Sequence, residues 1–183
     1  MFEFIKKIFK KTETSETPRQ SNLRPDGFQL ATLYDTDTIF KSILEESHTG
    51  HFSSNYIPPT AHPGLKHQLI QGVRNRTFPS NSKSCEAAIF VFIENDKAIA
   101  FSWAIQRTKN EVELYLIAVS PDHRRRGIGT LMVERSIKHF TPGTTFIVRL
   151  YKKSTSMLKI VETFGFTIAK SRGHQTTTLS YTS

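Results

Sequence analysis

A short basic turn that ends in two glycines carries the clearest chemistry in this sequence. Residues 124–129 read Arg-Arg-Arg-Gly-Ile-Gly, and residues 130–140 favour a helix. A helix that begins directly after such a turn points unpaired backbone N–H groups at one place, and its dipole favours negative charge there. Gly127 and Gly129 let the backbone approach a ligand closely, while the arginines add charge-assisted hydrogen bonds. The turn is therefore predicted to bind a pyrophosphate.

The elements around the turn fit this prediction. Glu111 to Val119 is rich in β-branched and aromatic residues and reads as a strand, which Ser120-Pro121-Asp122 ends. The helix after the turn is stopped by Pro142-Gly143. A nucleotide-hydrolase loop would need Gly-Lys-Ser/Thr, and a dinucleotide fingerprint would need a third glycine and a downstream acidic residue. Both of these phosphate loops are excluded.

The motif Arg-x-x-Gly-x-Gly, after a strand that ends in Ala118-Val119-Ser120-Pro121, resembles the GNAT superfamily of N-acetyltransferases. The resemblance implies that the turn holds the pyrophosphate of acetyl-coenzyme A. The residues implicated are Arg124 as the motif arginine, Arg126 as the next phosphate contact, and the backbone amides of Arg125, Arg126, Gly127, Ile128, Gly129 and Thr130. It also implies that Ile117, Ala118 and Val119 bind the pantetheine arm and offer N–H groups to the oxyanion, near a bulge that separates this strand from the next. The alternative for the arginine run is a nucleic-acid or other surface patch.

Glu113 is the candidate general base. Residues 113, 115 and 117 share one face of an ideal strand, which places Glu113 beside Tyr115. The resemblance implies that a glutamate here deprotonates the amine, often through water. The alternatives are a solvent-facing glutamate paired with a lysine, and Glu111 as the base.

A general acid for the leaving thiolate is harder to assign. The resemblance implies an asparagine before the last long helix and a tyrosine four residues before the Gly165-Phe166 pair. Ser154 lies near the asparagine position, and Val161 occupies the tyrosine position. Tyr151 is the proposed replacement and Tyr115 the second choice, although a thiolate with a pKa of about 8.5 can leave unaided.

The histidines and the cysteine offer weaker chemistry. No second cysteine or acidic cluster completes a zinc set around His48 and His51, so no metal site is predicted. Cys85 has no predicted base beside it, which argues against a covalent acetyl-enzyme.

Length and composition indicate one globular domain preceded by a short appendage. The chain has 183 residues, a net charge of +9, and neither a membrane-length apolar run nor a secretory segment, so a cytoplasmic location is predicted. Residues 1–11 could form a basic amphipathic helix that contacts an anionic membrane, or a mobile or docked terminus. Residues 12–26 read as a polar linker, and residues 27–183 form the predicted acetyltransferase domain.

The remaining pattern predicts an α/β (α+β) fold, with a mixed, mostly antiparallel sheet of six to seven strands and helices on both faces. This is the GNAT element order. The predicted strands are 28–33, 86–93, 98–106, 111–119, 145–151, 166–170 and 176–181, and the predicted helices are 35–46, 64–74, 130–140 and one that Ser154 caps and Gly165 ends. Loops are predicted at 48–63 and 75–84.

The predicted function is direct transfer of an acetyl group from acetyl-CoA to an amine in a ternary complex. The alternatives are a CoA-binding protein with weakened catalysis and a basic membrane or nucleic-acid adaptor, although a nucleic-acid partner is disfavoured. The sequence leaves open whether the acceptor is a small molecule or a protein, and whether the chain forms a homodimer.

Overall fold

The computed structural model describes residues 24–79, 84–172 and 176–183. The predicted basic helix at 1–11 and most of the linker lie outside the described residues. Arg24 belongs to the predicted linker, yet its guanidinium donates hydrogen bonds to Asp35 at 2.7 Å and to Asp96 at 3.3 Å. Contacts with the domain therefore begin upstream of its predicted start at Gly27.

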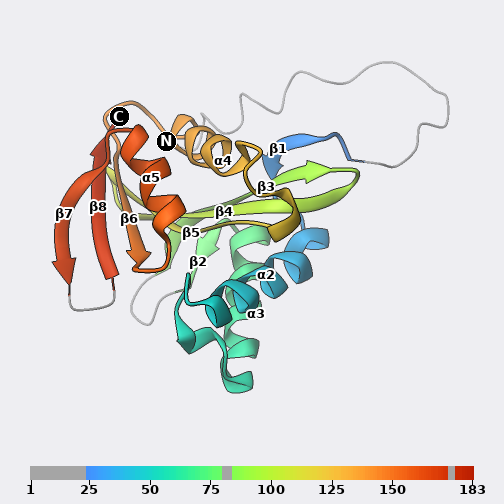
Figure 1. The fold of residues 1–183 in the computed structure, drawn as a ribbon. Coiled ribbons are helices and arrows are strands. Elements are labelled where there is room, and N and C mark those ends of the chain that lie inside the picture. The colour runs from blue at the N-terminus through green and yellow to red at the C-terminus, as the bar shows by residue number, and fades with distance from the viewer. Residues whose placement is uncertain (1–23, 80–83, 173–175) are drawn as a thin grey trace, which may run out of the picture.

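A central sheet organises the described part of the chain (Figure 1). Its strands run in the order β1-β3-β4-β5-β6-β8-β7, and β2 pairs separately with β3. Every pair is antiparallel except β5 with β6. The strands are β1 Gly27–Leu30, β2 Thr77–Phe78, β3 Cys85–Glu94, β4 Lys97–Thr108, β5 Glu111–Val119, β6 Thr145–Tyr151, β7 Thr167–Arg172 and β8 Thr176–Thr182.

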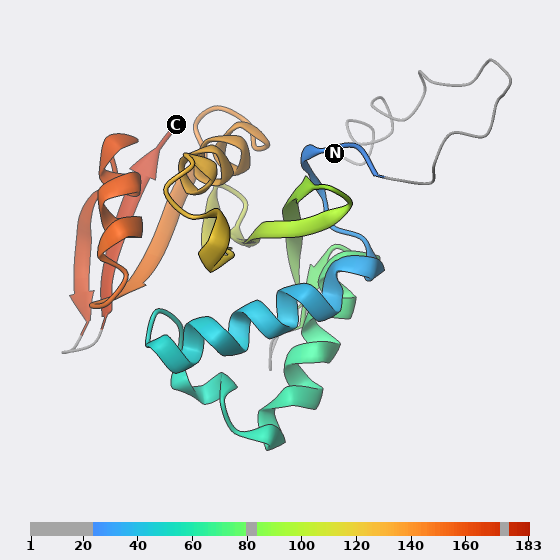
Figure 2. The same ribbon diagram turned by 45° about the vertical axis from the view of Figure 1, so that its right-hand side comes forward.

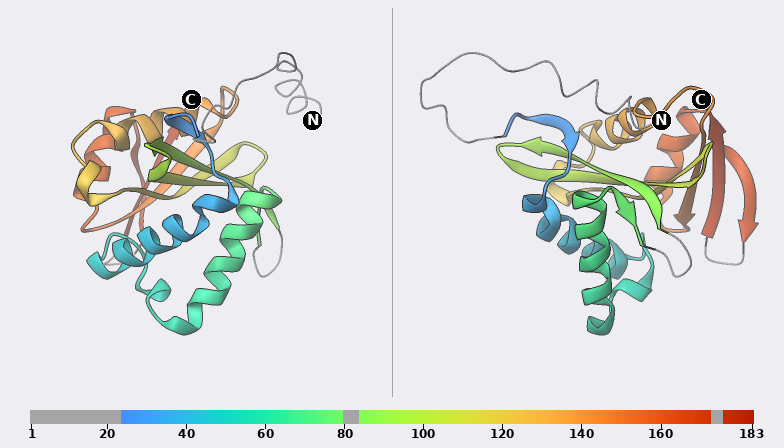
Figure 3. Two further views of the ribbon diagram at one scale, coloured as in Figure 1. Left: turned by 90° about the vertical axis from the view of Figure 1, so that its right-hand side faces the viewer. Right: turned by 180° about the vertical axis from the view of Figure 1, so that it is seen from behind.

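Helices cover both faces of this sheet. The first pair packs on one face and the last pair on the other, as the two views of Figure 3 show. The α-helices are α2 Thr36–Thr49, α3 His62–Arg74, α4 Ile128–Lys138 and α5 Thr155–Thr163, and the short 3-10 helices are η1 Leu33–Asp35, η2 Ser54–Tyr56, η3 Pro59–Ala61 and η4 Pro121–His123.

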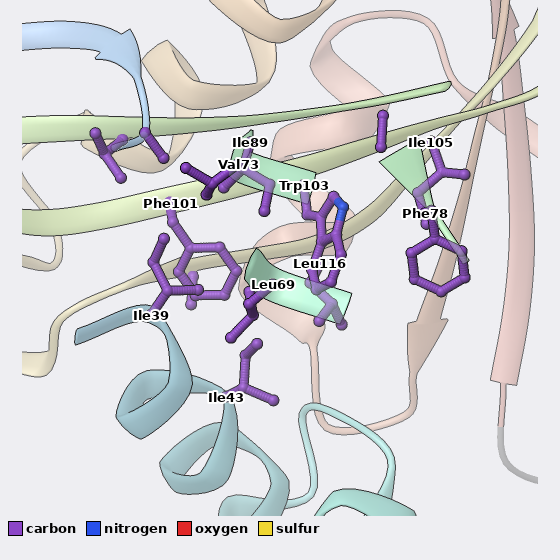
Figure 4. Packing of buried hydrophobic residues seen from close by; sticks show 14 of the residues in the cluster. Ile39, Ile43, Leu69, Val73, Phe78, Ile89, Phe101, Trp103, Ile105 and Leu116 are labelled. Carbon is purple, nitrogen blue, oxygen red and sulfur yellow. The ribbon is translucent and has the colours of Figure 1, made fainter. Parts of the chain in front are cut away.

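Each face of the sheet has its own hydrophobic core. Under α2 and α3, Ile39, Ile43 and Leu69 pack against Phe101 and Trp103 of β4 (Figure 4). Under α4 and α5, the core includes Met132, Val133, Val148 and Val161. Burying each of these large apolar side chains contributes about 1.5–3 kcal/mol, so both faces hold the middle strands in place.

The predicted fold class and most predicted elements are confirmed. β5 and β6 have the predicted bounds, and the β3–β4 turn places Asn95 and Asp96 at φ 52° and 62°, as a two-residue hairpin requires. The two predicted loops are partly wrong: 48–63 contains η2, η3 and the start of α3, and 75–84 contains β2. Such short elements lack the periodicity by which a sequence indicates a helix or a strand.

Candidate active site

The strands β5 and β6 pair for only part of their length, and a cavity opens where they separate. Their parallel register runs from Glu111↔Thr145 to Leu114↔Val148 and ends there. Beyond it, the β6-facing edge of β5 has no partner strand among the described residues. A cavity of about 1050 Å³ occupies this region, and its lining includes residues 113–119 of β5 and the turn before α4. Figure 2 shows that turn in gold, between β6 and the β3–β4 pair. The expected separation of the two strands is confirmed.

A bulge in β5 changes which side chains share a face. The register with β4 shifts between Trp103↔Leu116 and Ala104↔Leu114, so Tyr115 is the extra residue. Beyond the bulge, Leu116 belongs to the core under α2 and α3, while Ile117 packs against the core under α4 and α5. The prediction that Ile117 shares a face with Tyr115 is therefore wrong. The single extra residue reverses the strand's alternation.

The turn before α4 presents free backbone N–H groups to the cavity. Gly127 is the N-cap with φ +78°, no side chain caps the helix, and the first helical bond runs from the N–H of Leu131 to the carbonyl of Gly127. The amides of Ile128, Gly129 and Thr130 come before that bond, and all three residues line the cavity. The uncapped N-terminus of α4 thus provides the predicted geometry for binding an anion.

The two glycines of the turn are required for different reasons. Gly127 adopts a left-handed conformation, and a Cβ on it would meet nothing within 4 Å. A Cβ on Gly129 would lie 3.1 Å from Cδ1 of Ile160 on α5. Gly129 therefore also serves close packing of α4 against α5, a role that the sequence pattern did not indicate.

The three arginines of the turn have different surroundings. Arg124 donates from Nε to the carbonyl of Val119 at 3.0 Å and from Nη2 to Glu46 of α2. Arg125 lines the cavity and has φ +62°. Arg126 forms an ion pair with Glu94, with nitrogen–oxygen distances of 2.6 and 3.0 Å, and it does not line the cavity. Its role as a phosphate contact stays a prediction.

Glu46 links the turn to the helices on the opposite side of the cavity. Its carboxylate is buried, with 8% of the side chain exposed, and it pairs with Arg124 through Oε1. Its Oε2 lies 2.6 Å from Nδ1 of His51, which lines the cavity. One carboxylate therefore holds both a cavity histidine and the motif arginine.

Glu113 is buried at the point where β5 and β6 separate. Its Oε2 lies 2.6 Å from both Nε and Nη2 of Arg107 on β4. Its Oε1 lies 2.9 Å from Nη1 of Arg149 on β6. A carboxylate has about four acceptor positions, so the three nitrogens leave one of them on Oε1.

Three tyrosines line the same cavity as this carboxylate. The hydroxyls of Tyr56 on η2 and Tyr115 on β5 are hydrogen-bonded to each other, and both residues line the cavity together with Tyr151. Burial, followed by the neighbouring Tyr115, raises the pKa of Tyr56 above the ordinary phenol value, and burial likewise raises the pKa of Tyr115. Both phenols therefore stay protonated at neutral pH and can donate hydrogen bonds.

The start of α5 differs from the predicted capping. Ser154 is the N-cap residue, but its hydroxyl donates to the carbonyl of His51 at 3.3 Å and makes no capping bond. The predicted capping role is wrong because the loop after α2 lies close enough to take this donor. Val161, at the position where the resemblance implies a tyrosine, is fully buried in the core under α4 and α5.

The sequence reasoning did not single out Glu46, Tyr56, Arg107 and Arg149. One signal was present for Glu46, because it follows Ile39 and Ile43 at helical spacing on the buried face of α2. A charge on an apolar helix face usually needs a partner. Arg149 shares the 147, 149, 151 face of β6, but nothing local connects it with Glu113.

The described residues contain no group of three or more His, Cys, Asp or Glu side chains that could hold a metal ion. None of their helices is long and apolar enough to cross a membrane.

The comparisons with known proteins agree with this geometry. The sequence model of the acetyltransferase (GNAT) family matches residues 58–153, which is more than half of the chain. A search of curated protein sequences found no significant match.

Solved structures with the same fold are numerous but distant in sequence. The PaiA N-acetyltransferase of Thermoplasma acidophilum, in complex with coenzyme A, has a TM-score of 0.66 at 11% identity, over 87% of this chain and 100% of its own. A phosphinothricin acetyltransferase of the GNAT superfamily from Sinorhizobium meliloti, in complex with acetyl-CoA, has a TM-score of 0.65 at 18% identity, over 86% and 88%. The ribosomal-protein-S18-alanine N-acetyltransferase of Escherichia coli has a TM-score of 0.58 at 17% identity, over 86% and 94%. At these identities the likeness concerns the fold.

The family match, the separated strands and the uncapped glycine turn lead to one conclusion: this chain belongs to the GNAT family of acetyltransferases and transfers the acetyl group of acetyl-CoA.

Proposed function

We propose that the chain acetylates an amine directly, with acetyl-CoA and the acceptor bound together in the cavity between β5 and β6. The observation that supports this most strongly is the opening of the sheet beside the uncapped N-terminus of α4. Backbone N–H groups there suit a diphosphate, and the cavity leads from them to a buried carboxylate.

The residues that would hold the cofactor fall into two groups. The amides of Arg125 to Thr130 and the side chain of Arg125 would bind the pyrophosphate. The edge of β5 that has no partner strand among the described residues, at residues 117–119, would bind the pantetheine arm as an added strand. Acetyl-CoA supplies a thioester whose thiolate leaves as the amide bond forms.

The residues on the other side of the cavity would carry out the proton transfers and stabilise the oxyanion. Glu113 would accept the proton of the ammonium group through the acceptor position left on Oε1, directly or through water. Tyr151 would be the first candidate to replace the missing general acid, with Tyr115 as the second. Backbone N–H groups at 117–119 would stabilise the oxyanion.

A pair of glycine substitutions tests the cofactor site. Gly127 and Gly143 have φ +78° and +86°, and a Cβ on either meets nothing within 4 Å. Gly127→Ala and Gly143→Ala should therefore lose similar stability, about 1–2 kcal/mol, but Gly127 lines the cavity and Gly143 does not. We expect Gly127→Ala to weaken coenzyme A binding about tenfold in calorimetry, as for one lost charge-assisted hydrogen bond, and Gly143→Ala to leave it unchanged. If the two variants bind coenzyme A with equal affinity, the turn is not part of the cofactor site.

A further inference from the structure

The acceptor side of the cavity has an unusual charge balance. Glu113 is the only carboxylate among the described residues that line the cavity, whereas five lining residues carry a positive charge: Arg124, Arg125, Arg149, Lys153 and Lys159. The polyanionic cofactor accounts for the cations near the α4 turn. It does not account for Arg149, which extends from β6 beside Glu113.

The single carboxylate is already neutralised. Arg107 and Arg149 hold its two oxygens from either side. Beyond the one acceptor position left on Oε1 of Glu113, an acceptor with several positive charges would find no carboxylate in the described lining, and it would meet the guanidinium of Arg149. A polyamine therefore fits this site poorly, because an unpaired charge taken out of water is costly.

Arg149 has donors to spare. Its ion pair with Glu113 runs through Nη1, at 2.9 Å, and 53% of its side chain is exposed. A guanidinium carries five N–H donors in a planar fork that matches a carboxylate in bidentate geometry. Arg149 can therefore bind an anionic group that enters the cavity without first breaking its bond to the protein.

From this geometry we infer the acceptor class: an amine with a carboxylate on the adjacent carbon, as in a free α-amino acid. This inference rests on the proposed function. The ammonium group binds Oε1 of Glu113 and the carboxylate binds Arg149. Because these two protein groups are only 2.9 Å apart, the charges they recognise must be close together in the acceptor. A zwitterion also adds no net charge to the site.

The test compares acceptors that differ only in the carboxylate. Full-length protein is assayed for thiol release from acetyl-CoA with an aromatic, an aliphatic and a polar amino acid, each beside its α-amide and its decarboxylated amine, and with spermidine. For at least one side chain, the amino acid should exceed its amide and amine in kcat/KM by about 10- to 100-fold, the range for a hydrogen bond to a charged group.

Substitutions of Arg149 assign the preference to this residue. In Arg149→Ala, the preference for the carboxylate should fall to about one or invert, because Glu113 gains a free oxygen for a simple amine. Arg149→Lys should keep part of the preference for acceptors with a carboxylate. Lys152→Ala is the matched control, because Lys152 is an exposed cation just beyond the same strand and outside the cavity lining, and it should keep the full preference.

The outcomes separate this inference from the function on which it rests. Spermidine or decarboxylated amines equal to or better than the amino acids would overturn the acceptor class and leave the acetyltransferase intact. Coenzyme A binding without any acceleration by amino acids would overturn it as well. If coenzyme A fails to bind in calorimetry, the proposed cofactor site itself fails.

Discussion

Glu46 offers the sharpest test of how α2 is joined to the cofactor turn. Its buried carboxylate accepts from Arg124 through Oε1 and from His51 through Oε2. The substitution Glu46→Gln keeps the shape of the side chain but replaces one acceptor with an NH₂ group. One of the two donors must then face another donor, and the charge that both contacts use disappears.

The expected loss follows from the exposure of the partners. A hydrogen bond to a charged group contributes about 1.5–3 kcal/mol, and breaking a fully buried ion pair costs about 3–5 kcal/mol. Here the side chains of Arg124 and His51 are 41% and 31% exposed, so water can replace part of what is lost. We therefore expect Glu46→Gln to lower the free energy of unfolding by about 1–2 kcal/mol. For a domain of this size that corresponds to a decrease in Tm of roughly 2–8 °C.

Thermal unfolding followed by circular dichroism measures this effect. Glu45→Gln is the matched control, because Glu45 is the preceding residue of the same helix and is exposed. Its substitution removes the same charge from solvent and should change the stability by less than about 0.5 kcal/mol. If the two variants unfold at the same temperature, the connection of Glu46 with Arg124 and His51 does not stabilise the protein, and the reasoning is refuted.

Two further predictions concern the acceptor side of the cavity. Glu113→Gln should lower kcat by about 10²–10⁴-fold, the range for general acid–base catalysis, most strongly at low pH where the amine is hardest to deprotonate; an unaltered pH–rate profile would exclude Glu113 as the base. Tyr56 has a pKa in the folded state above the unfolded value of about 10, so its contribution to stability is fully present below pH 10 and is lost as the pH rises further. Tyr56→Phe should therefore reduce the decrease of the urea midpoint that occurs as the pH rises above 10. Tyr34→Phe, at a residue that is 75% exposed, should leave this decrease unchanged. If the midpoint falls equally with pH in both variants, ionisation of Tyr56 does not cause the loss of stability.

Local sequence determined the parts of this protein that depend on neighbours along the chain. The nine residues of β5, the break at Pro121 and the glycines of the α4 turn are set by backbone preferences that act over a few residues. The fold class followed from the order of such elements, and the anion-binding turn followed from the motif. These features could be predicted because they depend on interactions between residues that are close together in the sequence.

Only the tertiary structure decided which charges meet. Glu46 and Arg124 are 78 positions apart, and Arg149 reaches Glu113 only because β6 lies beside β5. The bulge at Tyr115 likewise comes from the pairing of β5 with β4, and it moved Ile117 to the opposite face. A side chain's partner depends on which elements pack together, and a one-residue change of register reverses every face beyond it. Glu113 and Arg124 could therefore be identified from sequence as candidates, whereas their ionic partners Arg149 and Glu46 and the shape of the acceptor side could not.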